Sequence, residues 1–154
     1  MPKRRDAIKM TEDEMKTFLE EQRVVNIATI GPDGNIHLVA MWFSLRNGNI
    51  AFETFAKSQK VQNLRRDSRI TALIEDGNDY NELRGLEIVG KGIVYDDAEI
   101  LAGVAQDVVR KYMEFDKEED VVAIAEAMAR NRVAIEIVPE KIVSWDHNKL
   151  GGTY

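Results

Sequence analysis

The segment Thr54–Lys60 (TFAKSQK) combines two hydroxyl side chains with two lysines. It leads from a predicted strand into a predicted helix, 58–66. A helix N-terminus presents free N–H groups and a partial positive charge, so it attracts anions. Lys57 and Lys60 add positive charge, and the hydroxyls of Thr54 and Ser58 add donors. This pattern predicts a site for one phosphate group. The alternative is an ordinary surface helix that Ser58 caps, with solvated lysines.

Two tryptophans are candidates for contact with a planar ring. Trp42 follows Met41 in a predicted strand, 36–45, where both side chains either fill a core or flank a ligand. Trp145 follows the last predicted strand. A tryptophan there suits an interface, in which the ring is dry and its N–H finds a partner. Packing without a ligand is the alternative for each.

Several classes of function are disfavoured by composition. The chain has no cysteine, which excludes disulfides, thiolate catalysis and cysteine-ligated metals. His37 and His147 are the only histidines, and nothing near them has ligand spacing, so we expect no metal site. The net charge of −6 argues against a nucleic-acid partner. No apolar run approaches the roughly 18 residues that span a membrane, and no secretory signal is evident. We therefore expect a cytoplasmic protein without a membrane partner.

Residues 11–154 are predicted to form a single domain behind a flexible arm, 1–10. Thr11 and Glu14 fit a capping box, which predicts a helix over 12–22. Further helices are expected at 98–114 and 121–131. The predicted strands are 24–30, 36–45, 50–54, 69–76 and 86–97, followed by a strand pair over 132–146 that Pro139 interrupts.

Turn signals connect these strands into an antiparallel meander. Gly31–Asn35 (GPDGN) and the Asn47-Gly48 pair are typical of tight turns between strands. Pro139 cannot donate to a ladder, so it marks an edge or a break in the last strand. Six or so antiparallel strands with few helices favour a small closed or partly open barrel.

The order of these motifs resembles the pyridoxamine 5′-phosphate oxidase-like split barrels, from about residue 12 to the end. Within that superfamily, Asn63–Asp67 (NLRRD) and the tail 144–154 (SWDHNKLGGTY) are most similar to the deazaflavin-dependent reductases of family B. The resemblance implies a mostly β fold, a six-stranded antiparallel split barrel with flanking helices, of the FMN-binding type. It also implies a homodimer with two cofactor sites at the subunit interface.

The resemblance also implies which residues bind the cofactor. Met41 and Trp42 lie along the ring system. Thr54, Ser58 and Lys60 hold the phosphate, and Lys57 adds a neighbouring charge. Trp145 comes from the partner subunit, and Lys149 replaces a basic residue of flavin-binding relatives.

Two departures from the family pattern bear on the cofactor. Gln59 stands where oxidases of vitamin B6 often carry an arginine, and their C-terminal Arg-x-His motif is absent. Loss of the arginine removes a bidentate phosphate clamp. Both departures favour coenzyme F420, whose long acidic tail could meet Lys57, Arg65 or Arg66. The alternative for these arginines and for Arg69 is a solvated surface.

The expected activity is therefore F420-dependent reduction of an activated double bond or conjugated carbonyl of a small molecule. The alternatives are an FMN-dependent oxidoreductase, a non-catalytic flavin or tetrapyrrole carrier, and a dimeric structural protein. No catalytic side chain is identified, because His37, Tyr154 or bulk water could protonate the product.

Overall fold

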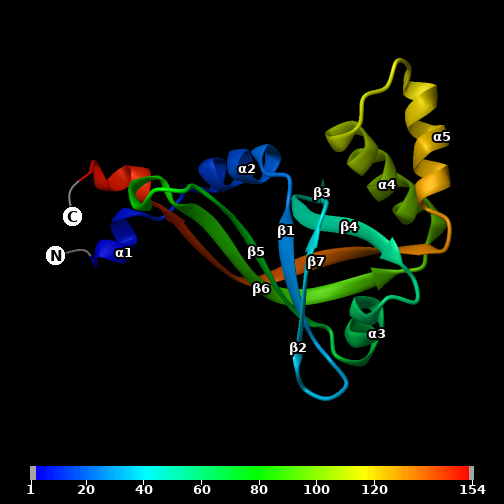
Figure 1. Ribbon diagram of the computed structural model, residues 1–154, viewed down its shortest axis with the longest axis horizontal. Coiled ribbons are helices and arrows are strands. Elements are labelled where there is room, and N and C mark those ends of the chain that lie inside the picture. Colours follow the sequence, from blue (N-terminus) through cyan, green and yellow to red (C-terminus); the bar gives the residue numbers. More distant parts are fainter. Residues whose placement is uncertain (1–2, 153–154) are drawn as a thin grey trace.

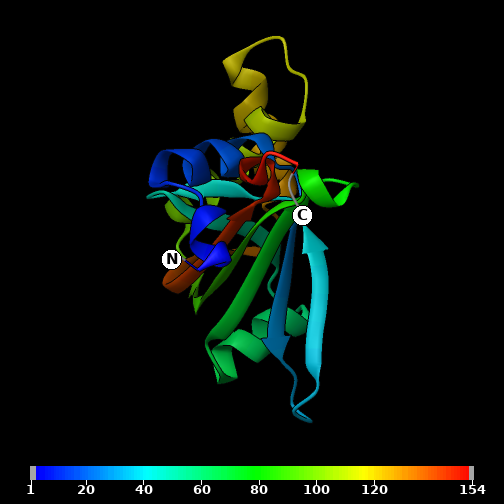
Figure 2. The same ribbon diagram turned by 90° about the vertical axis from the view of Figure 1, so that its left-hand side faces the viewer.

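The computed structural model describes residues 3–152. It is built around one seven-stranded antiparallel sheet that curls strongly on itself (Figures 1 and 2). The spatial order of the strands is β2-β1-β5-β6-β7-β4-β3. The strands are β1 Val25–Ile30, β2 Ile36–Met41, β3 Ser44–Arg46, β4 Asn49–Phe55, β5 Arg69–Asp76, β6 Arg84–Tyr95 and β7 Arg132–Asp146.

Five α-helices and two short 3-10 helices flank the sheet (Figure 1). They are α1 Arg4–Ala7, α2 Glu12–Glu21, α3 Gln59–Arg66, α4 Ala98–Tyr112, α5 Glu118–Met128, η1 Tyr80–Glu82 and η2 His147–Leu150. The predicted capping box is confirmed at the start of α2, where the Glu14 N–H donates to Thr11 Oγ1 and the Thr11 N–H donates to Glu14 Oε2.

The curl of the sheet follows from its connectivity. β2 and β3 lie at opposite ends of the strand order, yet only Trp42 and Phe43 separate them in the chain. Three consecutive Cα steps of 3.8 Å span at most about 11 Å. The two ends of the sheet must therefore come close together, which produces a barrel that is split between β2 and β3.

This break corrects the prediction of a single strand over 36–45. The segment is divided at Trp42–Phe43, so that β2 pairs with β1 while β3 pairs with β4. The fold is thus the expected antiparallel split barrel, with seven strands in place of six. The Asn-Gly turn is confirmed, since Asn47 and Gly48 both have positive φ, 52° and 76°, between β3 and β4.

Pro139 does not end β7, which continues to Asp146. β4 pairs with β7 only over residues 132–136, so at Pro139 the strand has a ladder partner on one side alone, β6, and the predicted edge position is confirmed. The register shifts beside it: Val89 pairs with Lys141 and Gly90 pairs with Pro139, which leaves Glu140 as the extra residue of a bulge. A bulge accommodates a residue that has no N–H to donate.

Three apolar clusters stabilise the fold. The largest fills the barrel and includes Phe18 of α2 and Leu64 of α3, so both helices cover the core. A second cluster joins α4 to α5. A third packs Val104 of α4 on Ala51 and Ala134, which point away from the barrel. The α4–α5 hairpin therefore covers the outside of β4 and β7.

Part of the predicted N-terminal arm contacts the end of β7. The Asp146 N–H donates to the Ile8 carbonyl over 2.7 Å, and the Met10 N–H donates to Ser144 Oγ over 3.0 Å. Met10 itself is buried in the main cluster. These contacts place the start of α2 beside the C-terminal end of the sheet.

Two glycine-to-alanine substitutions are expected to change stability in opposite directions. A Cβ on Gly90 would overlap the carbonyl oxygen of Val138 across the bulge, so Gly90→Ala should lower the free energy of unfolding by about 2 kcal/mol. A Cβ on Gly103, inside α4, would meet nothing within 4 Å, so Gly103→Ala should raise it by about 1 kcal/mol. Urea denaturation of the two variants measures both values. Equal effects of the two changes would contradict the bulge geometry.

Candidate functional site

The predicted phosphate segment lies where β4 ends and α3 begins. Thr54 is buried near the end of β4. The Lys60 ammonium, one residue into α3, reaches back and donates to Thr54 Oγ1 over 3.0 Å. The strand end and the helix start are thereby tied together, so the hydroxyl and the ammonium group form one site.

Ser58 occupies the N-cap position of α3 but does not cap the helix. No hydrogen bond joins its side chain to the first turn, and its Oγ is buried without a partner among the described residues. The expected serine cap is therefore wrong. A buried hydroxyl without a partner costs free energy. An anion at the helix start is the kind of group that would accept its hydrogen bond.

Positive charge dominates beside Lys60. Burial lowers its pKa, and the nearby Arg132 guanidinium lowers it further. Among residues 3–152, no carboxylate lies within ion-pair distance of the Lys60 ammonium. Arg132 does have a counter-ion, since its Nη1 lies 2.6 Å from Glu53 Oε2. The site therefore contains a partly buried cation without a counter-ion.

Lys57 is exposed on the turn before α3, and no ion pair involving it occurs within the described residues. Arg65 and Arg66, by contrast, already have partners. Arg65 pairs with Asp96 over 2.8 Å, and Arg66 donates to the carbonyl of Ile30. Lys57 is therefore the more available of these cations for an acidic group.

A polar cluster connects α3 to the first two strands. Asn63 of α3 donates to Thr29 Oγ1 over 3.0 Å, and both residues are buried. Thr29 pairs across the sheet with His37, whose Nδ1 is buried and has no partner among the described residues. Asn63 therefore bonds α3 to β1, and the unpartnered His37 Nδ1 lies on β2, the strand next to β1.

Trp42 lies in the break between β2 and β3 and stacks on Tyr112, the last residue of α4. The ring centroids are 4.5 Å apart and the planes differ by 8°. Trp42 is 48% exposed, so Tyr112 covers part of it and the remainder is accessible. Met41, its neighbour on β2, packs against the main core. Trp42 is thus accessible to a planar ring, whereas Met41 packs against the core.

Trp145 and Lys149 lie at the other end of the molecule. Thr54 pairs with Val133 near the start of β7, and Gly85 pairs with Trp145 near its end. At about 3.3 Å per residue, these positions are roughly 40 Å apart along the strand. Figure 1 shows the C-terminal end of β7 and α3 on opposite sides of the molecule, so Trp145 lies far from the phosphate segment of its own chain.

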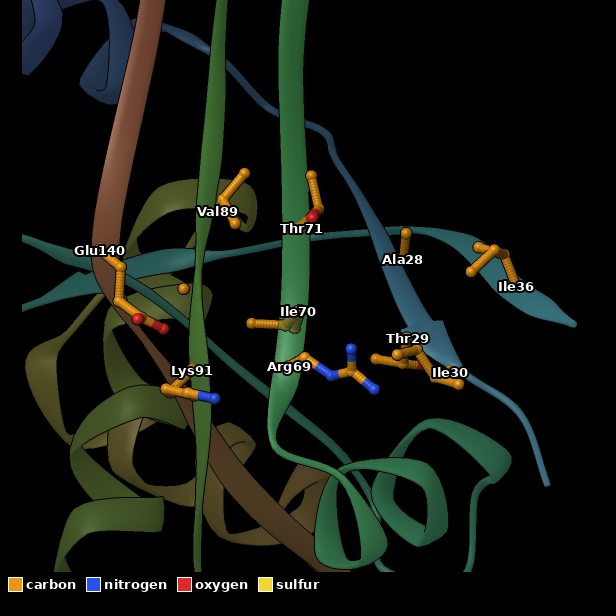
Figure 3. A pocket seen from close by; sticks show the side chains of 11 residues that line it. Ala28, Thr29, Ile30, Ile36, Arg69, Ile70, Thr71, Val89, Lys91 and Glu140 are labelled. Carbon is orange, nitrogen blue, oxygen red and sulfur yellow. The ribbon is translucent and has the colours of Figure 1, made fainter. Parts of the chain in front are cut away.

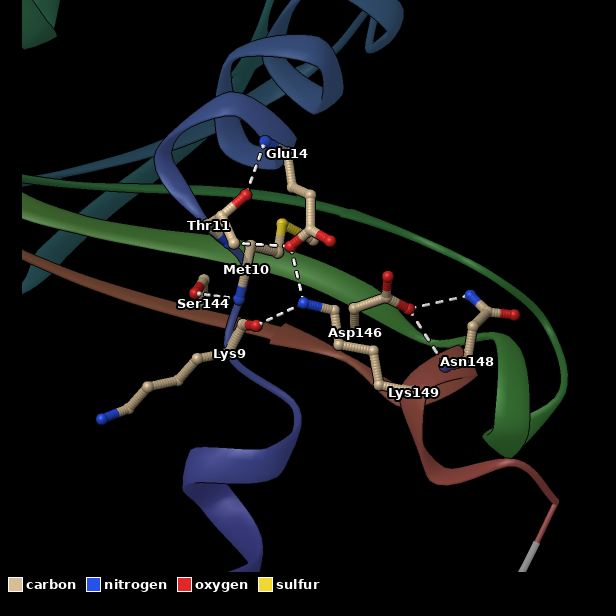
Figure 4. A network of polar contacts seen from close by, with 8 residues as sticks. All are labelled: Lys9, Met10, Thr11, Glu14, Ser144, Asp146, Asn148 and Lys149. Atoms are coloured by element: carbon tan, nitrogen blue, oxygen red, sulfur yellow. Dashed lines mark hydrogen bonds and ion pairs between the residues drawn. The ribbon is translucent and has the colours of Figure 1, made fainter.

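The Trp145 ring lies directly over Gly85. A Cβ at that position would overlap the indole ring, so the glycine is what allows the ring to lie against β6. Lys149 takes part in a network that joins the two ends of the chain (Figure 4). Its Nζ lies 2.6 Å from Glu14 Oε2 and 2.6 Å from the carbonyl oxygen of Lys9. In this chain Lys149 therefore fastens η2 to the start of α2.

The outer face of the sheet carries a hollow of about 410 Å³ (Figure 3). Arg69 and Lys91 lie at one end of it, with Thr71 and Val89 at the other. None of the eight predicted site residues lines this hollow. Arg69 is ion-paired with Asp67, whose pKa the guanidinium lowers to about 2.

Sequence reasoning missed two residues of the site. Arg132 begins β7 and reaches the phosphate segment only because β7 pairs with β4. Tyr112 is separated from Trp42 by 70 residues of chain and meets it only through the packing of α4. No local signal marked either one. Tyr154 lies outside the described residues.

Two further structural findings concern membranes and metals. Among residues 3–152, no helix has both the length and the apolar character needed to cross a bilayer. In the same part of the chain, no group of three or more histidine, aspartate or glutamate side chains is arranged to hold a metal ion.

The curled antiparallel sheet that is split between β2 and β3, with its flanking helices, defines a split-barrel protein. A model of the pyridoxamine 5′-phosphate oxidase family matches residues 11–146, and the chain belongs to this family. The predicted superfamily is thereby confirmed. Among curated proteins, no sequence gives a significant match.

Solved structures agree with this assignment. The conserved hypothetical protein Rv2991 of Mycobacterium tuberculosis is 40% identical with a TM-score of 0.91, and the match covers 99% of this chain and 94% of that one. An F420 reductase is 22% identical with a TM-score of 0.61, over 82% and 94% of the two chains. A heme storage protein from Vibrio cholerae is 14% identical with a TM-score of 0.67, over 86% and 94%. The last two show a shared fold.

Lys111, beside Tyr112, gives a prediction about pH. Burial, and secondarily Arg23, lowers its pKa to about 8. Between about pH 8 and its ordinary value of 10.5, the folded state loses the proton while the unfolded state keeps it, so stability should rise with pH in that window. Lys111→Met should reduce this rise, leaving the part due to Lys60, whose pKa is also lowered, and should stabilise the protein below pH 8.

Thermal unfolding between pH 7 and pH 10.5 measures the effect. Lys16→Met, which removes an exposed lysine of α2, is the matched control and should leave the rise in place. A parallel pH dependence of the wild type and Lys111→Met would contradict the burial of this ammonium group.

Proposed function

We propose that the protein is a homodimeric coenzyme F420-dependent reductase that transfers a hydride to an activated double bond or conjugated carbonyl of a small molecule. The observation that carries the proposal is the start of α3 in a fold of this family, where Lys60 donates to Thr54 Oγ1 and the buried Ser58 Oγ at the N-cap has no partner among the described residues.

The chemistry of this point fits the phosphate of such a cofactor. The Lys60 ammonium has spare donor capacity, because its one hydrogen-bond partner among the described residues is Thr54 Oγ1. Ser58 Oγ has a free donor, and the first turn of α3 adds the positive end of a helix. Arg132 contributes positive potential, which Glu53 partly offsets. A phosphate would satisfy the donors and reduce the repulsion between Lys60 and Arg132.

Gln59 favours the deazaflavin over the B6 phosphates. Its Nε2 donates to Asn63 Oδ1 over 2.8 Å, so it is tied along the helix and does not replace the arginine clamp of the B6 oxidases. The exposed Lys57 is placed on the adjacent turn, where it can meet an acidic tail. Phosphate binding then rests on Lys60 and the hydroxyls.

The proposed site needs two subunits. The phosphate segment and Trp145 lie roughly 40 Å apart along β7 of one chain. A second chain could bring its own Trp145 to the first chain's α3. Together with Trp42, this ring would enclose a planar group and exclude water from it.

An apolar surface suited to such a dimer lies on the outer face of the sheet. It is formed by outward side chains of β2, β5 and β6, which share one face because Leu38 and Ala28, Ala28 and Thr71, and Thr71 and Val89 are cross-strand pairs. Ile36 and Leu38 are 65% and 66% exposed. Contiguous exposed apolar side chains mark interaction surfaces. The hollow of Figure 3 lies on the same face.

When bound, coenzyme F420 supplies the hydride, and the protein supplies binding, orientation and exclusion of water. In this proposal Lys60, Thr54 and Ser58 hold the phosphate, while Met41 and Trp42 fix the ring. We propose no catalytic side chain, and a proton can reach the product from solvent.

FMN is the second candidate cofactor, because it also carries a phosphate that the start of α3 can hold. The fold neighbour from Vibrio cholerae raises a third candidate, a non-catalytic tetrapyrrole carrier. Titration of the purified protein with F420, FMN and heme separates these candidates. Micromolar binding of F420, followed by oxidation of reduced F420 by enones or quinones, would support the reductase. Flavin retained through gel filtration would support FMN, and tight binding without turnover would support a carrier.

Lys60→Ala should weaken cofactor binding by about 1–3 kcal/mol, because it removes a charge-assisted hydrogen bond to the phosphate. Fluorescence titration measures the dissociation constant. Lys16→Ala on α2 is the control and should bind like the wild type. Unchanged affinity of Lys60→Ala would show that the phosphate lies elsewhere.

Leu38→Asp should convert the dimer to a monomer, because it introduces a charge into the apolar outer face of the sheet. Sedimentation velocity measures the change. Val122→Asp places the same charge on α5, where the valine is 39% exposed, and should leave the dimer intact. A monomeric wild type, or a Leu38→Asp variant that stays dimeric, would refute the proposed interface.

A further inference from the structure

Trp42 and Phe43 have no ladder partners, because they lie between the end of β2 and the start of β3. Phe43 is completely buried, so its backbone groups need partners from elsewhere. The Tyr112 hydroxyl lies within hydrogen-bond distance of both backbone groups of Phe43. It accepts from the Phe43 N–H over 3.1 Å and lies 3.1 Å from the Phe43 carbonyl oxygen. One side chain of α4 thus takes the place of a neighbouring strand.

The Tyr112 ring also contacts the segment Trp42–Phe43. It stacks on Trp42, and the Arg23 guanidinium carbon lies 4.7 Å from its centroid. The hydroxyl also lies 2.8 Å from the carbonyl oxygen of Arg23, in the connection before β1. Tyr112 therefore joins α4, the connection between α2 and β1, and the break in the barrel.

The hydroxyl is suited to this role because it keeps its proton. Burial raises the pKa of Tyr112 above its ordinary value, so the group stays neutral at physiological pH. A neutral hydroxyl donates one hydrogen and accepts others. It can accept from Phe43 while it donates to one of the two nearby carbonyl groups.

The helix that carries Tyr112 is itself firmly seated. Val104 of α4 packs on Ala51 and Ala134 of the sheet, and Lys111 lies over the buried Phe43 ring with its Nζ 3.6 Å from the centroid. The end of α4 is therefore fixed relative to β4, which also carries Thr54. The position of the Trp42 ring relative to the phosphate segment is set through this helix.

We propose that Tyr112 is a positioning residue: it fixes the segment Met41–Phe43, against which the cofactor ring binds, and couples the α4–α5 hairpin to the site. The inference deepens the proposed function and rests on it. Tyr112 itself does not need to touch the cofactor.

Two substitutions separate the contributions of the hydroxyl and the ring. Tyr112→Phe keeps the stack and removes the hydrogen bonds, whereas Tyr112→Leu removes both. Phe115→Leu, in the connection between α4 and α5, is the matched control, since that ring is 39% exposed, lies three residues beyond Tyr112 and is not part of the Trp42–Tyr112 stack. Melting temperatures of all variants report any general loss of stability.

The first measurement needs no cofactor. In a Trp145→Phe background, Trp42 is the sole tryptophan, so its emission and its quenching by acrylamide report its environment. We expect Tyr112→Leu to shift the emission to longer wavelength and to increase quenching, with Tyr112→Phe close to the parent and Phe115→Leu identical to it.

The second measurement is titration of the otherwise wild-type variants with F420 and FMN. For the cofactor that the wild type binds, we expect the dissociation constant to rise about 10-fold in Tyr112→Phe and more in Tyr112→Leu, since a tenfold change corresponds to one hydrogen bond of this kind. The absorption band of the bound cofactor should shift in both variants and stay unchanged in Phe115→Leu.

The outcomes are distinguishable. If the wild type binds a cofactor and Tyr112→Phe binds it with the same affinity and spectrum, the positioning role is refuted while the proposed function stands. If the wild type binds neither cofactor, the proposed function fails. The quenching data then decide whether Tyr112 orders Trp42. Should Tyr112→Leu fail to fold, Tyr112→Phe and the control carry the test.

Discussion

The closure of the sheet through Trp42–Phe43 is the constraint on which the rest of the structure depends. A two-residue connection between strands at opposite ends of the sheet forces these ends together, and this creates the barrel interior that the main core fills. The same break removes two residues from the ladder and leaves backbone groups that need partners. The Tyr112 hydroxyl accepts from the Phe43 N–H and lies within hydrogen-bond distance of the carbonyl oxygens of Phe43 and Arg23, one of which takes its hydrogen. The α4–α5 hairpin covers β4 and β7, and through Tyr112 it also provides a hydrogen-bond partner at the break between β2 and β3.

The start of α3 is the second important region, and its main feature is positive charge without a counter-ion among the described residues. Lys60 is partly buried, lies near Arg132 and lacks a carboxylate partner among the described residues, while Ser58 and His37 each have a buried polar atom without a partner. Proteins seldom leave such groups unsatisfied. Lys60 and Ser58 lie together at the start of α3, whereas Arg65 and Arg69 have carboxylate partners. In the proposed function, a phosphate at the start of α3 would accept hydrogen bonds from Lys60 and Ser58.

The long strand β7 carries both halves of the proposed site. Its start pairs beside Thr54 and its end carries Trp145, roughly 40 Å further along the strand. In the proposed dimer, two-fold symmetry would bring the Trp145 end of each chain to the start of α3 in the other chain and form two equal sites. The network of Lys149, Glu14 and Lys9 stabilises the Trp145 end within its own chain.

The sequence by itself determined the local features: the capping box of Thr11, the Asn47-Gly48 hairpin, the strands and helices within a few residues, and the passage from strand to helix after β4 on which the predicted phosphate site lies. These features depend on neighbouring residues, whose spacing fixes backbone conformation and hydrogen bonding. Only the tertiary structure decided the break at Trp42–Phe43, the bulge at Pro139, and the approach of Tyr112 to Trp42 and of Arg132 to Lys60. Such contacts join positions tens of residues apart, and their energies depend on strand register and helix packing, which no local pattern specifies.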